Sequence, residues 1–352
     1  MEEVGPIGNV TIYDIAKAAQ VSPTTVSRAL NGSTLVREET RARVLLVAEK
    51  MGYEMPKVSP SPTRAKALNV SVVISDVLNP HIMRVVKGIH SVLAPNGASM
   101  HLFEHDGRRE DEMAYLSSLK QRGIDGLLLS TPHLESRHFL LIRQAGIPAV
   151  IFSSSATGAA DVPTVGVNNL EAACQAMLHL YRLGHTRIGI IRGPMGDLTN
   201  SEERLEGCRV AALSQGLELD FSLVKEGDFT IEGGYEAALS LLDVAEPPTA
   251  IFAFSDTMAL GAIAAAKERG IPVPERLSIV GFDDIPLAAW SDPPLTTISQ
   301  PAALIGQRAA ELLLDVMAGK AVEELRIRLP YELVERGSTA PPAGVQMTRR
   351  GS

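Results

Sequence analysis

The sequence has very little cysteine, no long apolar run and no leader-like start. Only two of its 352 residues are cysteines, Cys174 and Cys208, which fit neither a disulfide framework nor a zinc-ligand spacing, so a reducing compartment is expected. No run of about 18 apolar residues could span a membrane, and the acidic start MEEVGPIGNV lacks the apolar core of a signal peptide. We therefore expect a cytoplasmic protein without a membrane segment.

The sequence also lacks the motifs of the common enzyme classes. It contains no GxSxG nucleophile elbow, no phosphate-binding P-loop and no HExxH zinc motif. Four histidines fall within one stretch of the chain without a paired nucleophile: His81, His101, His105 and His133. A further histidine, His185, is expected to pack at the start of a strand. The prediction is a protein that is not an enzyme and that needs no metal or cofactor.

Positive charge is scarce overall but unevenly distributed. The chain carries a formal net charge of −8, which by itself argues against a nucleic-acid partner. The segment from Val10 to Lys66, however, holds nine lysines and arginines against five acidic residues. A basic segment on an acidic body can be attracted to phosphates while the body avoids non-specific contact. The pattern indicates a nucleic-acid-binding head on a body with a different task.

Residues 11–31, TIYDIAKAAQVSPTTVSRALN, have the pattern of two short helices joined by a tight turn. Thr11 and Asp14 can form a capping box at the start of the first helix, and Ser22 can cap the second. Neither helix is long enough to bury its apolar face alone, and the segment from Glu38 to Met51 can supply a third helix. The pattern predicts a helix-turn-helix unit, whose second helix can enter the major groove of DNA.

The composition changes after Tyr53, where EMPKVSPSPTRAKA indicates a linker rich in proline and serine. From Asn69 onward, short apolar runs alternate with helical patterns. The seven runs expected to form strands are Val70–Ser75, Ser99–Phe103, Gly126–Leu129, Ala149–Phe152, Arg187–Ile191, Ala250–Ala253 and Ser278–Gly281. Continuous apolar strands that alternate with helices are typical of parallel sheets covered on both faces. The number of elements predicts two α/β lobes rather than one sheet.

Together with the helix pair, six later motifs resemble the LacI/GalR (lactose-repressor) family of transcription regulators. They occur in this order: NP at Asn79-Pro80, GHTRIG at Gly184–Gly189, RLEG at Arg204–Gly207, PPTAIFAFSD at Pro247–Asp256, LSIVGFDD at Leu277–Asp284 and PPLTTISQP at Pro293–Pro301. No single motif is decisive, but their order and spacing cover nearly the whole chain. The resemblance implies an α/β fold class, with a small all-α helix-turn-helix head and a two-lobed, periplasmic-binding-protein-like body of doubly wound parallel sheets.

The resemblance also implies how the chain is divided. The expected parts are a head at 1–53, a proline-containing linker at 54–68, an effector-binding and dimerisation domain at 69–340 and a disordered tail at 341–352. Within the body, lobe 1 is expected at about 69–167 and 298–329, and lobe 2 at about 168–297 and 330–340. The chain would then cross between the lobes three times.

In this family, base contacts come from the first exposed positions of the second helix, here Pro23 and Thr24, and from Arg28. Arg28 can donate to O6 and N7 of guanine, and the threonine methyl can touch thymine. The expected phosphate contacts come from hydroxyl, phenol and amide side chains: Thr11, Tyr13, Ser22, Thr25, Ser27 and Asn31. For Ser22 and Asn31 the alternative is helix capping alone, and for Arg28 it is a solvated surface arginine.

The chain departs from the family pattern in the head and in the linker. Gln20 stands where the family usually has glycine, so a non-glycine residue is expected at positive φ, and Arg37 replaces the usual serine before the third helix. Pro60 and Pro62 fall where family members form a hinge helix and insert a leucine into the minor groove. Because an interior proline costs a helix about 3 kcal/mol, we hypothesise that a standard hinge helix is missing and that Val58 is the remaining apolar wedge.

Ligands of doubly wound sheets bind beyond the carboxyl ends of the strands. The residues expected there are polar or aromatic: Asp76, Asn79, Ser130, Ser153, Asn200, Arg204, Phe229, Ser255, Asp256 and Asp283. The resemblance makes Arg204 and Asp283 the anchors that grip vicinal hydroxyls, while Phe229 can stack on an apolar ring face. The alternative for Arg204 is an ion pair on the helix surface with Glu206 or Asp220.

Purine-sensing family members use an arginine and a threonine where Leu198 and Asn200 stand here. We therefore expect a small-molecule effector that is a sugar or sugar derivative, with a purine- or nucleoside-responsive regulator as the alternative. Asp284 and Trp290 are expected to serve packing and structure rather than the ligand. A periplasmic-type sugar-binding protein would share the two lobes, but it would need a signal peptide and would have no head.

The expected function is that of a repressor whose operator affinity the effector controls. A two-helix head makes few base contacts, so a homodimer that reads a palindromic double-stranded DNA operator is expected. By analogy with the family, the helices expected at Ile82–Leu93 and Pro301–Met317 would carry the dimer face. The effector would close the lobes and thereby change the spacing of the two heads.

Overall fold

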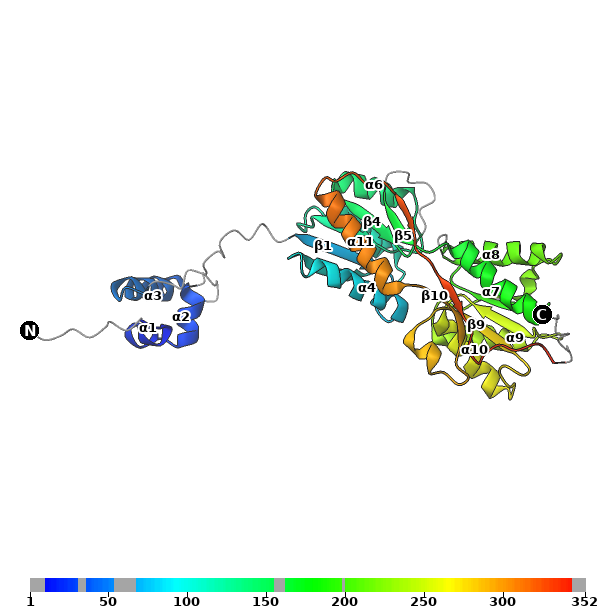
Figure 1. Ribbon diagram of the computed structural model, residues 1–352. Helices are drawn as coiled ribbons and strands as arrows, with labels where there is room; N and C mark the ends of the chain where they lie inside the picture. The colour runs from blue at the N-terminus through cyan, green and yellow to red at the C-terminus, as the bar shows by residue number, and fades with distance from the viewer. Residues whose placement is uncertain (1–9, 31–35, 54–67, 155–161, 198–199, 344–352) are drawn as a thin grey trace, which may run out of the picture. The chain divides into compact units, whose positions relative to one another are not determined.

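In the computed structural model, the described residues are 10–30, 36–53, 68–154, 162–197 and 200–343. The chain forms two compact units, Met1–Lys66 and Ala67–Ser352, which differ in secondary structure (Figure 1). Val58, Pro60 and Pro62 lie outside the described residues, so the hypothesis about the hinge stays a prediction. The same holds for most of the expected tail.

The described residues of the first unit form three helices: α1 (Ile12–Ala19), α2 (Pro23–Leu30) and α3 (Glu38–Lys50). Their inward faces meet in a small core, in which Ile15, Val26 and Val44 have no exposed surface. On each helix the buried residues recur at the three- and four-residue spacing that places side chains on one face. The three short helices thus bury together the apolar surface that none of them could bury alone.

Side-chain hydrogen bonds define the starts of α1 and α2. The amide of Thr11 donates to Asp14 Oδ2 (2.9 Å) and the amide of Asp14 donates to Thr11 Oγ1 (3.4 Å), which is the predicted capping box. At α2, the amide of Thr25 donates to Ser22 Oγ (3.1 Å). Arg37 forms no side-chain cap on α3. Local sequence therefore defines the first two helices more sharply than the third.

Gln20 ends α1 in the left-handed conformation, with φ 55° and ψ 45°, as the sequence predicted. A residue with a Cβ costs about 1–2 kcal/mol there, whereas glycine costs about 0.4–1 kcal/mol through its freedom in the unfolded chain. We therefore expect Gln20→Gly to stabilise the head by about 0.5–1 kcal/mol. Hydrogen exchange of the α1 and α2 amides in the full chain measures the change. Gln20→Ala should give no gain, and faster exchange in Gln20→Gly would contradict the prediction.

The first sheet of the second unit is parallel throughout its described strands, in the order β11-β5-β4-β3-β1-β2. The strands are β1 (Asn69–Ile74), β2 (Ser99–Glu104), β3 (Gly126–Leu129), β4 (Ala149–Phe152), β5 (Thr164–Gly166) and β11 (Arg326–Arg328). One face is covered by α4 (Pro80–Leu93) and α11 (Ala302–Met317), and the other by α5 (Arg109–Ser118) and α6 (Ser136–Ala145). Both faces of β1 are buried, because Val72 packs toward α4 and α11 and Val73 toward α5 and α6.

The second sheet has the order β12-β10-β9-β8-β6-β7 and is parallel except where β12 pairs antiparallel with β10. Its strands are β6 (Ile188–Arg192), β7 (Val224–Glu226), β8 (Ala250–Ala253), β9 (Ser278–Asp283), β10 (Thr296–Ser299) and β12 (Glu332–Val334). Two helix pairs pack on it, α7 (Asn169–Leu183) with α8 (Ser201–Ser214) and α9 (Ile231–Leu242) with α10 (Asp256–Glu268). Two single-turn 3-10 helices are η1 (Phe221–Leu223) and η2 (Pro286–Ala289). The predicted fold class is confirmed.

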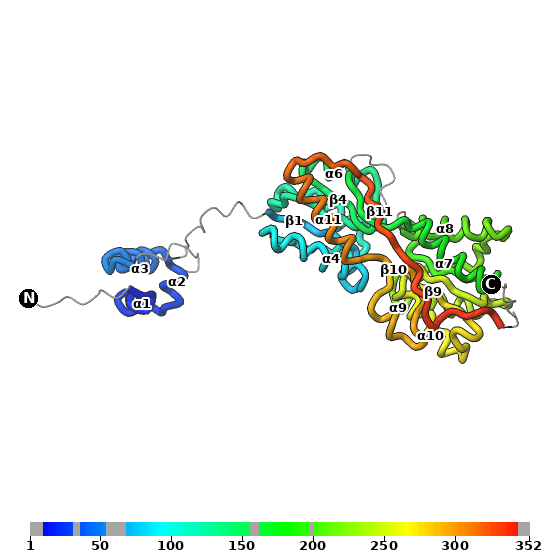
Figure 2. The backbone as a smooth tube through the Cα atoms, viewed as in Figure 1, coloured from blue at the N-terminus to red at the C-terminus, as the bar shows by residue number. Residues whose placement is uncertain are grey.

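We call the first sheet with α4, α5, α6 and α11 lobe 1, and the second sheet with α7 to α10 lobe 2. The chain passes between the lobes three times, between Gly166 and Asn169, between Ser299 and Ala302, and between Arg328 and Glu332 (Figures 1 and 2). Several backbone connections between two lobes favour hinge closure over independent movement. The topology therefore suits a body that opens and closes.

Two glycines allow α4 and α11 to pack unusually closely. A Cβ added at Gly88 would lie 2.1 Å from the carbonyl oxygen of Ala303, and one at Gly306 would lie 2.0 Å from that of Val85. Both distances are far below van der Waals contact, so only glycine fits at either position. The close contact joins α4 and α11 into one layer of lobe 1.

Five strands were not predicted from the sequence: β5, β7, β10, β11 and β12. All but β10 have three residues, which is too short to show a period, and β10 reads TTIS without an apolar run. These strands extend the two sheets toward their edges. Most of the predicted strands lie nearer the centre, where burial on both faces requires the continuous apolar residues that the sequence displays.

Candidate functional site

The head presents a polar face on α2. Pro23, Thr24 and Arg28 are all exposed, and Tyr13 on α1 is 74 % exposed. This exposure leaves the side chains expected to read bases accessible to a partner, since Val26 and Ala29 occupy the inward face of the same helix. Contact between these side chains and DNA stays a prediction.

The predicted phosphate-binding hydroxyls have structural partners within the head. Thr11 Oγ1 donates to Asp14 Oδ2 (2.6 Å), and Ser22 Oγ shares a hydrogen bond of 2.8 Å with Thr25 Oγ1. Capping is therefore one established role of Thr11 and Ser22, and a phosphate would have to use their remaining hydrogen-bonding capacity. Ser27 is half-buried, and Asn31 lies outside the described residues.

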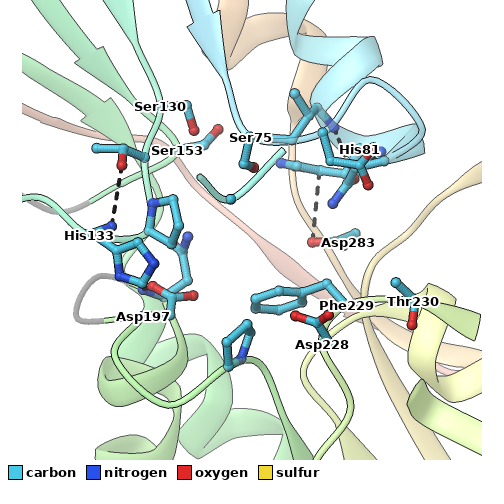
Figure 3. Close-up of a pocket in the computed structure, with 18 of the residues that line it drawn as sticks. Ser75, His81, Ser130, His133, Ser153, Asp197, Asp228, Phe229, Thr230 and Asp283 are labelled. Carbon is cyan, nitrogen blue, oxygen red and sulfur yellow. Dashed lines mark hydrogen bonds and ion pairs between the residues drawn. The ribbon is translucent and has the colours of Figure 1, made fainter. Parts of the chain in front are cut away.

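A cavity of about 350 Å³ lies between the two lobes, at the carboxyl ends of their strands. Figure 3 shows most of the side chains that line it, which come from both lobes. Its volume falls within the range of about 300–1,000 Å³ that small-molecule sites occupy. The position agrees with the rule that doubly wound sheets bind ligands beyond the carboxyl ends of their strands.

Most of the predicted effector-binding residues meet at this cavity: Asp76, Asn79, Ser130, Ser153, Asn200, Arg204, Phe229 and Asp283. They come from strand ends, loops and helices of both lobes and are brought together only by the fold. Their contact with a ligand stays a prediction.

Ser255 and Asp256, also predicted to bind the effector, do not line the cavity. Ser255 caps α10 by accepting a hydrogen bond from the amide of Met258 (3.2 Å). Asp256 is fully buried, and its carboxylate accepts hydrogen bonds from the amide of Ile285 (2.7 Å) and from the hydroxyl of Thr297. Both side chains point back into the protein because they fasten neighbouring segments of lobe 2, so the expectation for them is corrected.

Arg204 forms the base of the lobe 2 side of the cavity. Its Nε donates to Asn169 Oδ1 (2.9 Å), its Nη1 donates to the carbonyl of Phe254, and its guanidinium stacks 3.6 Å from the ring centroid of Phe282. The side chain is buried, and burial lowers its pKa. The alternative of a surface ion pair is wrong, because Glu206 pairs with Arg209 instead.

Asp283 sits beside Arg204 and joins both lobes. Its Oδ1 accepts a hydrogen bond from Gln300 Nε2 (2.7 Å) and lies 3.8 Å from Nδ1 of His81, which belongs to lobe 1. Burial, which outweighs the attraction of Asp283, lowers the pKa of His81 and keeps its imidazole neutral at pH 7. A neutral imidazole and a carboxylate can together hold hydroxyl groups, since one can donate while the other accepts.

Two hydrogen bonds connect the lobes at the cavity margin. Nδ1 of His133 lies 2.8 Å from the carbonyl oxygen of Gly196, so this nitrogen carries the donated proton. Nη1 of Arg84, on α4, donates to the carbonyl oxygen of Asp284 (2.7 Å). Both contacts depend on the relative position of the lobes, so closure or opening of the cleft must change them.

Several lining residues were not predicted: His81, Asp106, Thr131, His133, Asp197, Asp228, Thr230 and Gln300. Asp228 and Thr230 follow β7, a strand too short to be recognised from its own pattern, but they flank Phe229, which was predicted, and that neighbour could have identified them. Asp106 follows β2 closely, and that position could have identified it.

Two aromatic side chains outside the cavity gave opposite results. Trp290 was expected to pack, but it is 86 % exposed at the end of η2. His185 was expected to pack at the start of β6, and it does so with 1 % exposure, within hydrogen-bond distance of Ser278 Oγ (3.1 Å) and Thr249 Oγ1 (2.9 Å).

Within the described ranges, no group of His, Cys, Asp and Glu is arranged to hold a metal ion. No helix in those ranges is long and apolar enough to cross a membrane.

Two family descriptions match the sequence. Residues 11–55 match "Bacterial regulatory proteins, lacI family", and residues 177–339 match "Periplasmic binding protein-like domain". The HTH-type transcriptional repressor CytR of Escherichia coli (strain K12) is 37 % identical, over 94 % of this chain and 96 % of its own length. Catabolite control protein A of Priestia megaterium is 33 % identical, over 94 % of this chain and 99 % of its own.

Solved structures resemble most of the chain as well. A complex of the transcriptional regulator CelR with cellobiose has a TM-score of 0.69 at 32 % identity, covering 94 % of this chain and 100 % of that one. The lac repressor dimer bound to operator and an anti-inducer has a TM-score of 0.70 at 28 % identity, covering 94 % and 99 %. A regulator from Enterococcus faecium with bound ribose has a TM-score of 0.69 at 29 % identity, covering 78 % and 99 %.

Proposed function

The chain belongs to the lacI family of bacterial regulatory proteins and is a DNA-binding transcription regulator, not an enzyme; on this premise we propose that a sugar or sugar derivative controls its affinity for operator DNA. The observation that carries the proposal is the cavity between the lobes, which is lined by hydroxyls, amides and carboxylates around Arg204 and Asp283. Groups of this kind hold hydroxyl-rich ligands through several hydrogen bonds at once.

Two structural relatives support a carbohydrate as the effector class. The structures of CelR and of the Enterococcus faecium regulator contain cellobiose and ribose, and both resemble this chain over most of its length. Leu198, which stands where purine-sensing members have a polar residue, lies outside the described residues, so the choice between a sugar and a purine depends on the other residues of the cavity.

A thermal-shift screen with a panel of carbohydrates and nucleobases tests the proposal. A bound sugar should raise the melting temperature of the full chain, because a ligand that binds only the folded state stabilises it. The same sugar should change operator affinity in a gel-shift titration. Binding of a nucleobase without any carbohydrate would overturn the sugar proposal and favour the purine or nucleoside alternative.

The proposed regulation couples the cavity to DNA binding. A sugar that binds both lobes at once favours the closed body, and the two binding events then change each other's affinity by the same factor. We propose a homodimer as the acting form, which would bind a palindromic operator in the cytoplasm. Leu102 on β2 and Leu304 on α11 are 41 % and 40 % exposed, which is consistent with a covered apolar surface on lobe 1. Sedimentation of the full chain as a monomer at micromolar concentration would contradict the dimer.

Arg28→Ala is expected to reduce operator affinity about ten- to a hundredfold, because a bidentate contact with guanine contributes about 1–3 kcal/mol of discrimination. The measurement is a gel shift with an operator selected from a random pool of DNA duplexes. Arg43→Ala is the matched control, since Arg43 is an exposed arginine on α3 rather than on α2. Equal losses in the two variants would show that Arg28 contributes only charge.

A further inference from the structure

The charges around the cavity are strongly unbalanced. Five aspartates line it: Asp76, Asp106, Asp197, Asp228 and Asp283. Among the described lining residues, Arg204 is the one lysine or arginine, and the buried imidazole of His81 is neutral at pH 7. A ligand that carries a phosphate or a carboxylate would therefore enter a strongly negative site.

The positive charge of Arg204 is already compensated by the protein. Two of its guanidinium nitrogens donate to Asn169 and to the carbonyl of Phe254. The carboxylates of Asp283 and Asp197 are the neighbouring charges that favour its cationic form most. An anionic ligand would have to compete with these carboxylates for one buried cation, so Arg204 is a poor receptor for an added anion.

Asp106 and Asp228 are two negatively charged residues that lie on opposite lobes of the body. Asp106 lies in the turn after β2 in lobe 1, and Asp228 lies in the turn after β7 in lobe 2. Neither carboxylate has a hydrogen-bond or ion-pair partner in the part of the chain that the structure describes. Partial burial, then the charges of Glu226 and Asp106, raise the pKa of Asp228. The two residues therefore repel each other across the cleft.

Two buried polar atoms at the cavity also lack a hydrogen-bond partner among the described residues. Nδ1 of His81 and Oγ of Ser153 are shielded from solvent and make no hydrogen bond with any described residue, and both residues line the cavity. His81 is 5 % exposed. An uncharged hydroxyl can satisfy either atom, because an imidazole nitrogen and a hydroxyl both pair readily with it. These atoms indicate a ligand rich in hydroxyl groups.

We infer that the effector is a polyhydroxylated molecule without an anionic group, and that Asp106 and Asp228 select an amine-bearing form of it over a phosphorylated or carboxylated form. This inference rests on the proposed control of operator affinity by a sugar. An ammonium group between the two carboxylates would replace repulsion by attraction and would hold both lobes together. A phosphate at the same place would add a third negative charge.

The test is calorimetric titration of the full chain with matched sugar sets. Each set contains one parent sugar, its amino derivative, its phosphate and its acid, with glucose, galactose, ribose and cellobiose as parents. We expect binding to be confined to neutral and amino members, with an amino member about tenfold tighter than its parent, because its ammonium group would be attracted by the carboxylates of Asp106 and Asp228.

A double variant separates the two carboxylates from the rest of the cavity. Asp106→Asn with Asp228→Asn should abolish the tenfold preference for the amine and should admit the phosphorylated member of the set. Glu110→Gln with Glu236→Gln is the matched control, because it removes two exposed charges from α5 and α9 at residues that do not line the cavity. It should keep the preference of the parent chain.

The possible failures are distinguishable. Tightest binding of a phosphorylated or carboxylated sugar to the parent chain would overturn the charge selection while leaving a sugar-responsive regulator. Retention of the amine preference in the Asp106/Asp228 double variant would overturn the role of these two residues. If no sugar of any set binds or alters operator affinity, the proposed function itself fails.

Discussion

Gly306→Ala, a change of one methyl group on α11, is expected to make the protein about 3 kcal/mol easier to unfold. The added carbon would lie 2.0 Å from the carbonyl oxygen of Val85 on α4, so the two helices would have to separate. The sign of the effect is diagnostic, because glycine to alanine inside a helix normally stabilises it by about 0.8–1 kcal/mol. Here the cost of overpacking exceeds the gain in helix propensity.

Urea unfolding followed by far-UV circular dichroism measures this change, and hydrogen exchange shows whether the loss is confined to α4 and α11. The control is Arg308→Ala on the same helix, where the side chain is exposed and pairs with Glu311 (3.0 Å). The free energy of unfolding of that variant should differ from that of the parent chain by no more than about 0.5 kcal/mol. A Gly306→Ala protein as stable as the parent would mean that the helices are not held this close together.

Arg204→Met is expected to weaken effector binding by about two orders of magnitude, or about 3 kcal/mol. Methionine is long enough to keep the apolar contact with Phe282, but it removes the donors to Asn169 and to the carbonyl of Phe254. It also leaves the carboxylate of Asp283 without its neighbouring cation. Removing one partner of a buried hydrogen bond costs far more free energy than removing one partner of an exposed hydrogen bond, because the buried group that remains has no water to replace it.

Calorimetry with the sugar identified by the screen measures the loss. Arg209→Met is the matched control, because Arg209 is on the same helix but pairs only at the surface with Glu206 (2.5 Å). Arg204→Lys, which keeps the charge and loses the planar fork, should fall between, at about tenfold. If Arg204→Met folds with an unchanged melting temperature and binds the sugar normally, the assignment of Arg204 as an anchor is wrong.

The parts of the fold that could be predicted are those in which a physical requirement repeats along the chain. β3, β4 and β8 were predicted residue for residue, because burial on both faces requires an unbroken apolar run with turn residues beside it. In the head, the capping box follows from local backbone chemistry, whereas the left-handed Gln20 was expected because the family usually has glycine at that position. Strands of three residues could not be predicted, because they are held by their neighbours in the sheet and carry no pattern of their own.

The site was predictable as a place but not as a set of side chains. The rule that ligands bind at strand ends found Asp283 and Arg204, yet it also selected Asp256, which stands at the same kind of position after β8. Whether such a side chain turns toward the cleft or back into the protein depends on its partners, here Ile285 and Thr297. Those partners are distant in sequence, so the direction becomes apparent only in the folded chain.

α4 connects these observations along one rigid element. Its first turn lines the cavity through His81, its second reaches the other lobe through Arg84, and its third is pressed against α11 at Gly88. A helix of 14 residues is about 21 Å long and bends little over that length. α4 is therefore a single rigid element that contacts the cavity, lobe 2 and α11 at successive turns. Movement of lobe 2 that displaces the first two turns of α4 would therefore displace its third turn as well, and with it α11, because the backbones of the two helices are in direct contact at Gly88 and Gly306.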